Sequence, residues 1–84
     1  MADVDPKLRR AWREHPRTKV NLIIRVDGTL RSGIDQLEER DIEIRRRFRL
    51  TKRLAIRTTG AAAAKLAQES WVTSIEPDEP VKAL

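Results

Sequence analysis

The sequence predicts an α+β domain in which two helices cover one face of a four-stranded antiparallel sheet, preceded by an N-terminal helix. Four short segments alternate apolar with polar residues, which is the period of a strand. Two segments between them repeat their apolar residues every three or four positions, which is the period of a helix. The 84 residues suffice for one small domain, and 39% hydrophobic residues are enough for the chain to fold.

The first predicted element is a helix that begins at Pro6 and ends before the dipeptide 15–16. Asp5 is its predicted N-cap, because a carboxylate there accepts hydrogen bonds from free backbone N–H groups, and proline is favoured at the first helical position. Leu8 and Trp12 form its only apolar stripe. We therefore expect this helix to pack weakly on the domain or to bind a partner, such as a second copy of the chain.

A strand is predicted over residues 19–26, where apolar and polar side chains alternate, and it ends at Asp27-Gly28. From Thr29 the apolar residues follow helical spacing. Gly33 weakens this second helix by about 1 kcal/mol relative to alanine. We expect it to be there because a strand or a partner approaches the helix closely.

Residues 42–50 alternate again, which places Phe48 on the core face together with Ile42, Ile44 and Leu50. Arg46 interrupts that face. After a turn at 51–53, a third strand is predicted at 54–58. Thr59 then caps a helix rich in alanine, and a last strand around Val72 and Ile75 ends at Pro77.

This order of elements is β-α-β-β-α-β after the N-terminal helix, which is the ferredoxin-like arrangement. Right-handed crossovers predict the strand order 4-1-3-2. We divide the chain into an N-terminal helical extension (1–17), the α+β domain (18–78) and an extended C-terminal tail (79–84). The fold by itself decides little about function, because this architecture serves many activities.

The last strand carries a motif that resembles a known family. The run VTSIEPD (72–78) precedes a six-residue tail. On a β-α-β-β-α-β core, this run resembles the propeptide and inhibitor domains of subtilisin-like serine proteases, over roughly residues 19 to 84. No protease domain follows in the sequence, so the chain is similar to the freestanding inhibitors of that family.

The resemblance implies a role for each part of this region. The exposed sheet face would pack on two surface helices of the protease, and Glu76 and Asp78 would cap the N-termini of those helices. The tail would lie in the substrate cleft as an added strand, with Val81 and Leu84 in apolar pockets, Ala83 in a crowded one and Lys82 toward solvent. The sheet face expected at this interface is strongly basic, with Arg25, Arg45, Arg47, Arg49 and Arg57.

The residues of the tail agree with this interpretation. Residues 81–84 alternate apolar and polar or small side chains, as in a peptide bound in extended form. Pro77 and Pro80 restrict the unbound tail, so less entropy is lost on binding. A tail that ends at Leu84 would bind as a product does, and inhibition would be competitive and non-covalent. A frayed terminus is the alternative interpretation.

A second interpretation is a basic nucleic-acid-binding module. Arg45, Arg47, Arg49, Lys52 and Arg53 surround an aromatic residue on a predicted sheet, and the net charge is +5. Placing Phe48 in the core removes the stacking surface, which leaves binding through charge alone. A third interpretation is a homodimer formed through the N-terminal helix and Trp12.

The sequence lacks the residue patterns of an enzyme. We find no phosphate-binding loop, no metal-ligand cluster and no base near Ser70 or Ser74, and His15 is the sole histidine, so no metal or cofactor is expected. There is no cysteine. No apolar run approaches the roughly 20 residues that span a bilayer, and the N-terminus lacks a signal-peptide pattern. We therefore expect a cytoplasmic protein without a membrane partner.

Overall fold

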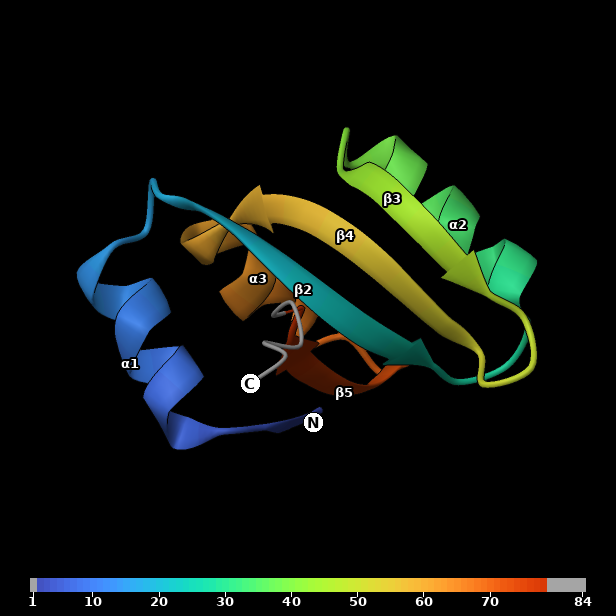
Figure 1. Ribbon diagram of the computed structural model, residues 1–84, viewed down its shortest axis with the longest axis horizontal. Helices are drawn as coiled ribbons and strands as arrows, with labels where there is room; N and C mark the ends of the chain where they lie inside the picture. Colours follow the sequence, from blue (N-terminus) through green and yellow to red (C-terminus); the bar gives the residue numbers. More distant parts are fainter. Residues whose placement is uncertain (1, 79–84) are drawn as a thin grey trace, which may run out of the picture.

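The computed structural model describes residues 2–78 and shows an α+β domain with three helices and one five-stranded sheet (Figure 1). Its elements follow in the order β1 (Asp3–Val4), α1 (Pro6–Glu14), β2 (Lys19–Val26), α2 (Leu30–Glu39), β3 (Glu43–Phe48), β4 (Arg53–Thr59), α3 (Gly60–Leu66) and β5 (Val72–Pro77). The predicted N-caps are confirmed: Asp5 accepts from the Lys7 backbone N–H at 2.9 Å, and Thr59 accepts from that of Ala62 at 3.3 Å.

The sheet has the strand order β1-β5-β2-β4-β3. The four predicted strands lie relative to one another as expected, but β1 was not predicted. It pairs parallel to β5, with Asp3 opposite Ser74 and Val4 opposite Ile75. The sheet is therefore mixed and five-stranded, and its order differs from the classic ferredoxin-like one. A strand of two residues is too short to show any alternation in sequence.

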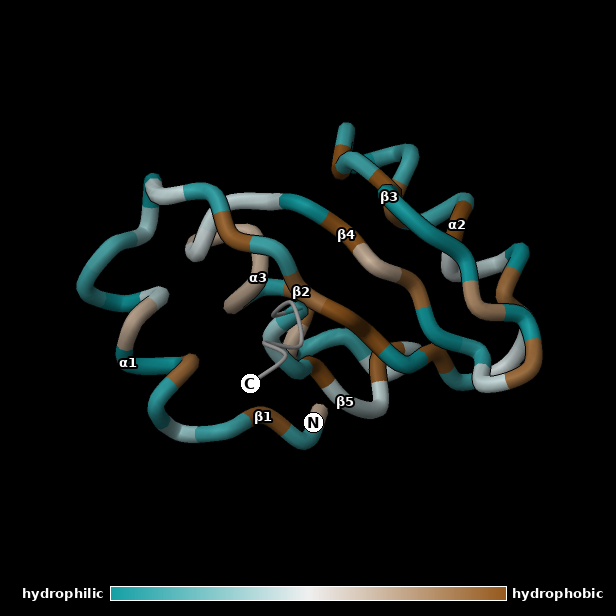
Figure 2. The backbone as a smooth tube through the Cα atoms, viewed as in Figure 1, coloured by the Kyte–Doolittle hydropathy of each residue, from teal (hydrophilic) through white to brown (hydrophobic). Residues whose placement is uncertain are grey.

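The helices α2 and α3 lie behind the sheet in Figure 1, α2 behind β3 and α3 behind β2 and β4. The core fills the space between these helices and the sheet. Figure 2 shows the apolar stretches of β2 and β4 side by side in the middle of the sheet. The largest fully buried side chains come from both layers: Leu22, Ile24, Leu37, Leu54, Ile56 and Leu66.

The N-terminal helix α1 packs within its own domain, against α3. Trp12 is only 3% exposed and belongs to the core cluster, and Leu8 packs against that cluster. A Cβ placed on Gly60, the first residue of α3, would lie 3.0 Å from the carbonyl oxygen of His15 and from the Cα of Trp12. Of the apolar stripe of α1, Trp12 is thus buried in the domain close to α3, and Leu8 is partly buried against the core.

Strand β3 contains a β-bulge that corrects the predicted placement of Phe48. Ile44 pairs with Ile56, but the register shifts so that Arg46 pairs with Ala55 and Phe48 with Arg53. A bulge inserts one extra residue and so reverses which face the following side chains occupy. Phe48 is therefore 38% exposed on the face away from the helices, and Leu50 in the following turn is fully exposed. Placing these two residues in the core was wrong.

Gly33 in α2 lies close to strand β2, as expected from the sequence. A Cβ at this position would lie 2.5 Å from Cγ1 of Val26, which is itself 3% exposed and cannot move aside freely.

Gly33→Ala gains about 1 kcal/mol of helix propensity, but overpacking costs about 1–3 kcal/mol. We expect the free energy of unfolding to fall by on the order of 1 kcal/mol, as measured by urea unfolding followed by circular dichroism. Adding Val26→Ala should remove the clash, and a Gly33→Ala variant more stable than the parent would contradict this account.

Candidate functional site

The face of the sheet turned away from α2 and α3 is the candidate functional site, and we call it the open face. The strand registers place side chains of all five strands on it, and no helix of the described chain lies in front of it (Figure 1). The open face consists of Asp3 of β1, Asn21, Ile23 and Arg25 of β2, Glu43, Arg45, Arg46 and Phe48 of β3, Arg53, Ala55 and Arg57 of β4, Ser74 and Glu76 of β5, and Asp78.

The centre of the open face is apolar. Ile23 lies opposite Ala55 on the neighbouring strand, and Phe48 lies at one end of the face. Ala55 is 1% exposed, yet it does not belong to the core cluster, so side chains of the open face themselves cover it. A small apolar centre with a charged surround is the usual anatomy of a protein-binding surface.

Five arginines and four carboxylates surround this centre, and two ion pairs cross it. Arg53 Nη1 lies 3.3 Å from Oε1 of Glu76, and Arg45 Nη1 lies 3.7 Å from Oδ2 of Asp78. Arg53 lies on β4 and Glu76 on β5, whereas Arg45 lies on β3 and Asp78 follows β5. Both ion pairs therefore pass over β2, which lies between β4 and β5. The four side chains are between 29% and 50% exposed. Ion pairs this exposed contribute about 0–1 kcal/mol, so they can open when another partner arrives.

The structure divides the five cations that the sequence grouped as one basic surface. Arg45 and Arg53 lie on the open face. Arg47, Arg49 and Lys52 instead line a hollow of about 410 Å³ on the side of α2, together with Leu30, Arg31 and Ile34. The bulge in β3 causes this division, because it turns Arg46 and Phe48 to the open face and Arg47 to the face of Leu54.

Sequence reasoning missed Arg46, Phe48 and Ile23 as parts of this surface. A charged residue at a core-facing position was the one available signal: Arg46 interrupts the apolar face of its strand, and a change of face removes that conflict. Of the arginines that the sequence placed on the sheet face, Arg25, Arg45 and Arg57 do lie there, whereas Arg47 and Arg49 do not.

Strand β5 brings Glu76 and Asp78 to the open face. Glu76 pairs with Ile23 in the ladder, and the backbone N–H of Asp78 donates to the carbonyl of Asn21 at 3.0 Å. Asp78 is thus held beside β2 at the edge of the open face. The predicted cleft-binding residues Pro80, Val81, Lys82, Ala83 and Leu84 lie outside the described residues.

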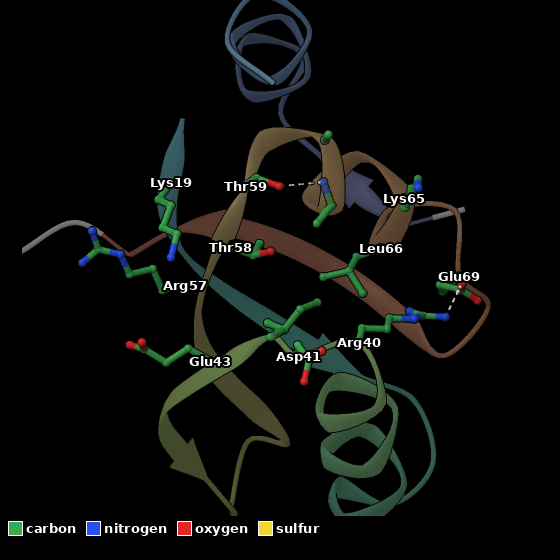
Figure 3. Close-up of a pocket in the computed structure, with 13 residues that line it drawn as sticks. Lys19, Arg40, Asp41, Glu43, Arg57, Thr58, Thr59, Lys65, Leu66 and Glu69 are labelled. Atoms are coloured by element: carbon green, nitrogen blue, oxygen red, sulfur yellow. Dashed lines mark hydrogen bonds and ion pairs between the residues drawn. The ribbon is translucent and has the colours of Figure 1, made fainter. Parts of the chain in front are cut away.

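A larger hollow of about 730 Å³ lies between the ends of α2 and β3 and the helix α3 (Figure 3). Its charged residues are of both signs, and Arg40 on one side pairs with Glu69 at 2.6 Å while its guanidinium lies 5.7 Å from the Trp71 ring. Among residues 2–78, no group of three His, Asp or Glu side chains could hold a metal ion.

Comparison with protein-family models, with curated proteins and with solved structures finds no match for this chain. No helix of the described residues is long and apolar enough to cross a membrane.

Proposed function

We propose that this domain binds and inhibits a subtilisin-like serine protease. The open face docks on the protease surface, and the segment that follows Asp78 enters the substrate cleft as an added strand. The observation that carries the proposal is the placement of Glu76 and Asp78. Both lie on the open face, at the point where the chain passes into residues 79–84.

The ion pairs of the open face support this role. In the free domain Arg53 and Arg45 hold the two carboxylates, at 3.3 and 3.7 Å. N-terminal N–H groups of two protease helices would replace these arginines, because such groups lack backbone partners and carry a positive dipole end. The exchange costs little, since half-exposed ion pairs contribute about 0–1 kcal/mol each.

The apolar residues of the open face supply the rest of the contact. Ile23 at the centre and Phe48 at one end are accessible in the free domain and would be covered on docking. Burial of apolar side chains is the main favourable term in association. Binding to the folded protease also stabilises it against unfolding, which would let the domain assist folding of the protease when supplied in trans.

Inhibition of a subtilisin-type protease tests the proposal directly. We expect the full chain to inhibit competitively and a version ending at Pro80 to be weaker by about two orders of magnitude. The truncation removes two apolar side chains, each worth about 1.5–3 kcal/mol when buried. Inhibition constants measured with a peptide substrate give both values. Equal inhibition by the two versions, or none by either across a panel of such proteases, would reject the proposed function.

Substitutions that remove the negative charges of Glu76 and Asp78 but keep the side-chain shape test how much the two carboxylates contribute to inhibition. Glu76→Gln with Asp78→Asn should raise the inhibition constant by about tenfold, because the macrodipole favours a carboxylate over an amide. Glu38→Gln with Glu39→Gln is the matched control, since both are exposed residues of α2 and change the net charge equally. If the two double variants behave alike, the carboxylates act only through net charge.

A second candidate function is nucleic-acid binding, and the exposure of Phe48 favours it. Phe48 lies opposite Arg53 on the open face, and Arg46 shares that face. An exposed aromatic ring among arginines can stack a base while the cations contact phosphates. The affinity for a single-stranded oligonucleotide, measured by fluorescence anisotropy, would then fall with Phe48→Ala and with rising salt. Truncation after Pro80 would leave this affinity unchanged.

A further inference from the structure

The hairpin formed by β3 and β4 exposes two large apolar side chains. Leu50 is fully exposed and Phe48 is 38% exposed, and they are the exposed large hydrophobic residues found in the described chain. Both fall in one hairpin, at the end of the sheet opposite α1 (Figure 1). A buried role was expected for these residues, so their exposure asks for a different explanation.

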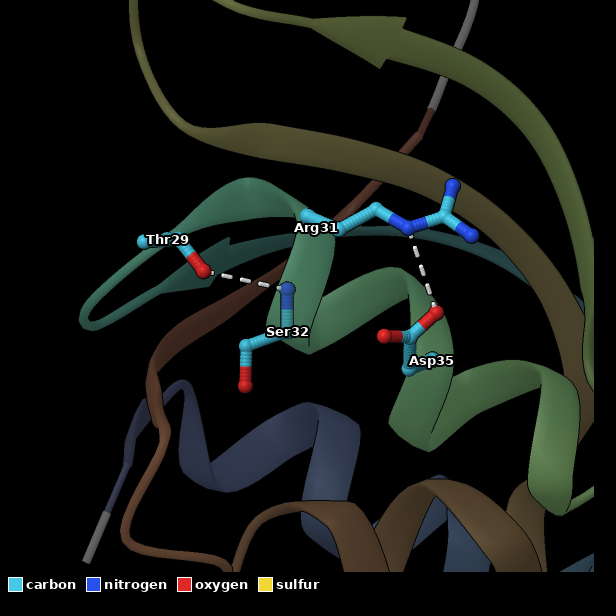
Figure 4. Close-up of polar contacts among 4 residues, drawn as sticks. All are labelled: Thr29, Arg31, Ser32 and Asp35. Atoms are coloured by element: carbon cyan, nitrogen blue, oxygen red, sulfur yellow. Dashed lines mark hydrogen bonds and ion pairs between the residues drawn. The ribbon is translucent and has the colours of Figure 1, made fainter.

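Cations surround the exposed leucine. Arg49 and Lys52 lie in the same turn, where the Lys52 backbone N–H donates to the carbonyl of Arg49, and Arg47 precedes them on β3. Within residues 2–78, none of these three side chains forms an ion pair. Arg31 of α2 lines the same hollow but is engaged with Asp35 at 3.3 Å, while Thr29 caps the helix through the Ser32 N–H (Figure 4).

The turn itself is held in place by the sheet. The backbone N–H of Val26, at the end of β2, donates to the carbonyl of Lys52 at 2.9 Å, and Val26 is a core residue. Lys52 adopts a left-handed backbone conformation, with φ of 54°, which closes the turn. Leu50 therefore projects from a structured support.

We propose that this hairpin docks on the surface of an anionic phospholipid bilayer. An apolar side chain at a tip with cations beside it matches such a surface, where the leucine enters the acyl boundary and the cations meet lipid phosphates. Each cation near an anionic bilayer strengthens binding by roughly fivefold. The phosphates of a nucleic acid would satisfy the cations equally well, but they would leave Leu50 in water. The leucine thus favours a bilayer.

This inference does not depend on the proposed protease binding. The latter uses the open face and residues 79–84, whereas bilayer docking uses Leu50 and the cations on the side of α2. It departs from the expectation of no membrane partner, which rested on the lack of an apolar run long enough to span a bilayer. Surface docking needs no such run, because the hairpin would enter only the boundary between headgroups and acyl chains.

Vesicle co-sedimentation of the full chain tests the inference. We expect binding to vesicles of mixed phosphatidylcholine and phosphatidylglycerol and none to phosphatidylcholine alone. Leu50→Ser should weaken binding by roughly tenfold, and Arg49→Ala with Lys52→Ala by roughly twentyfold or more. Arg10→Ala with Arg17→Ala is the matched control, because it removes two exposed charges near α1 and leaves the hairpin intact.

A label at the tip reports insertion directly. The chain has no cysteine, so Leu50→Cys gives one site for an environment-sensitive dye, and Ala11→Cys gives a control site on the exposed side of α1. The emission of the Leu50 label should shift to the blue with anionic vesicles, and that of the Ala11 label should not. Absence of binding to anionic vesicles would overturn the inference. An equal loss of vesicle binding in the two double-alanine variants would overturn it too. So would binding of an oligonucleotide in place of vesicles, if Leu50→Ser left that binding unchanged.

Discussion

Trp12→Ala should bring the domain close to global unfolding. Trp12 is 3% exposed and joins α1 to the core, and replacing a buried tryptophan with alanine typically costs about 3–5 kcal/mol. A domain of this size has on the order of 4–12 kcal/mol of stability in total. We therefore expect a large fall in the urea midpoint, followed by far-ultraviolet circular dichroism, with an unchanged slope against denaturant.

Trp12→Phe is the matched control for this experiment. The indole Nε1 of Trp12 is buried and has no hydrogen-bond partner within residues 2–78. Phenylalanine removes this unpaired donor and keeps most of the apolar volume, so it should cost much less than alanine does. Equal stability of the alanine variant and the parent would mean that α1 contributes nothing to the core.

Gly60→Ala should loosen the contact between α1 and α3. The added Cβ would lie 3.0 Å from two backbone atoms, the carbonyl oxygen of His15 and the Cα of Trp12, and backbone cannot rotate aside as a side chain does. Overpacking of this kind costs about 1–3 kcal/mol and occasionally more. We expect the free energy of unfolding, measured in urea, to fall by an amount within that range.

Limited proteolysis locates the effect of Gly60→Ala. Arg13 and Arg17 flank the contact, so trypsin should cut the variant there faster than it cuts the parent. Ala61→Ser serves as the control, because position 61 is exposed and adjoins the contact. If the Gly60 variant keeps both its unfolding midpoint and its tryptic rate, the close approach of the two helices is not required for stability.

Much of the fold could be predicted because the strands and helices carry strong local periodicity. The caps at Asp5 and Thr59 and the close contact at Gly33 were visible in sequence, since each depends on one residue type in one local setting. Strand β1 could not be predicted, because its two residues pair with a strand some seventy positions away and have no pattern of their own.

The candidate site was harder to predict than the fold. One inserted residue near Arg46 changes the face of Phe48, and no glycine or proline marks the bulge. The ion pair of Arg45 with Asp78 also joins positions far apart in the chain, so only the assembled sheet reveals it. The sequence predicted the residues of the open face correctly where a strand alternates without interruption, as at Arg25 and Arg57.

The place of β5 in the sheet has a consequence for synthesis of the chain. This last strand lies between β1 and β2, the first two strands made, and contributes Val72 and Ile75 to the core. A nascent chain on the ribosome therefore has a gap between β1 and β2 until β5 leaves the exit tunnel. The core can close only after β5 has emerged, and until then the nascent domain exposes an unpaired edge of β2 to cellular chaperones.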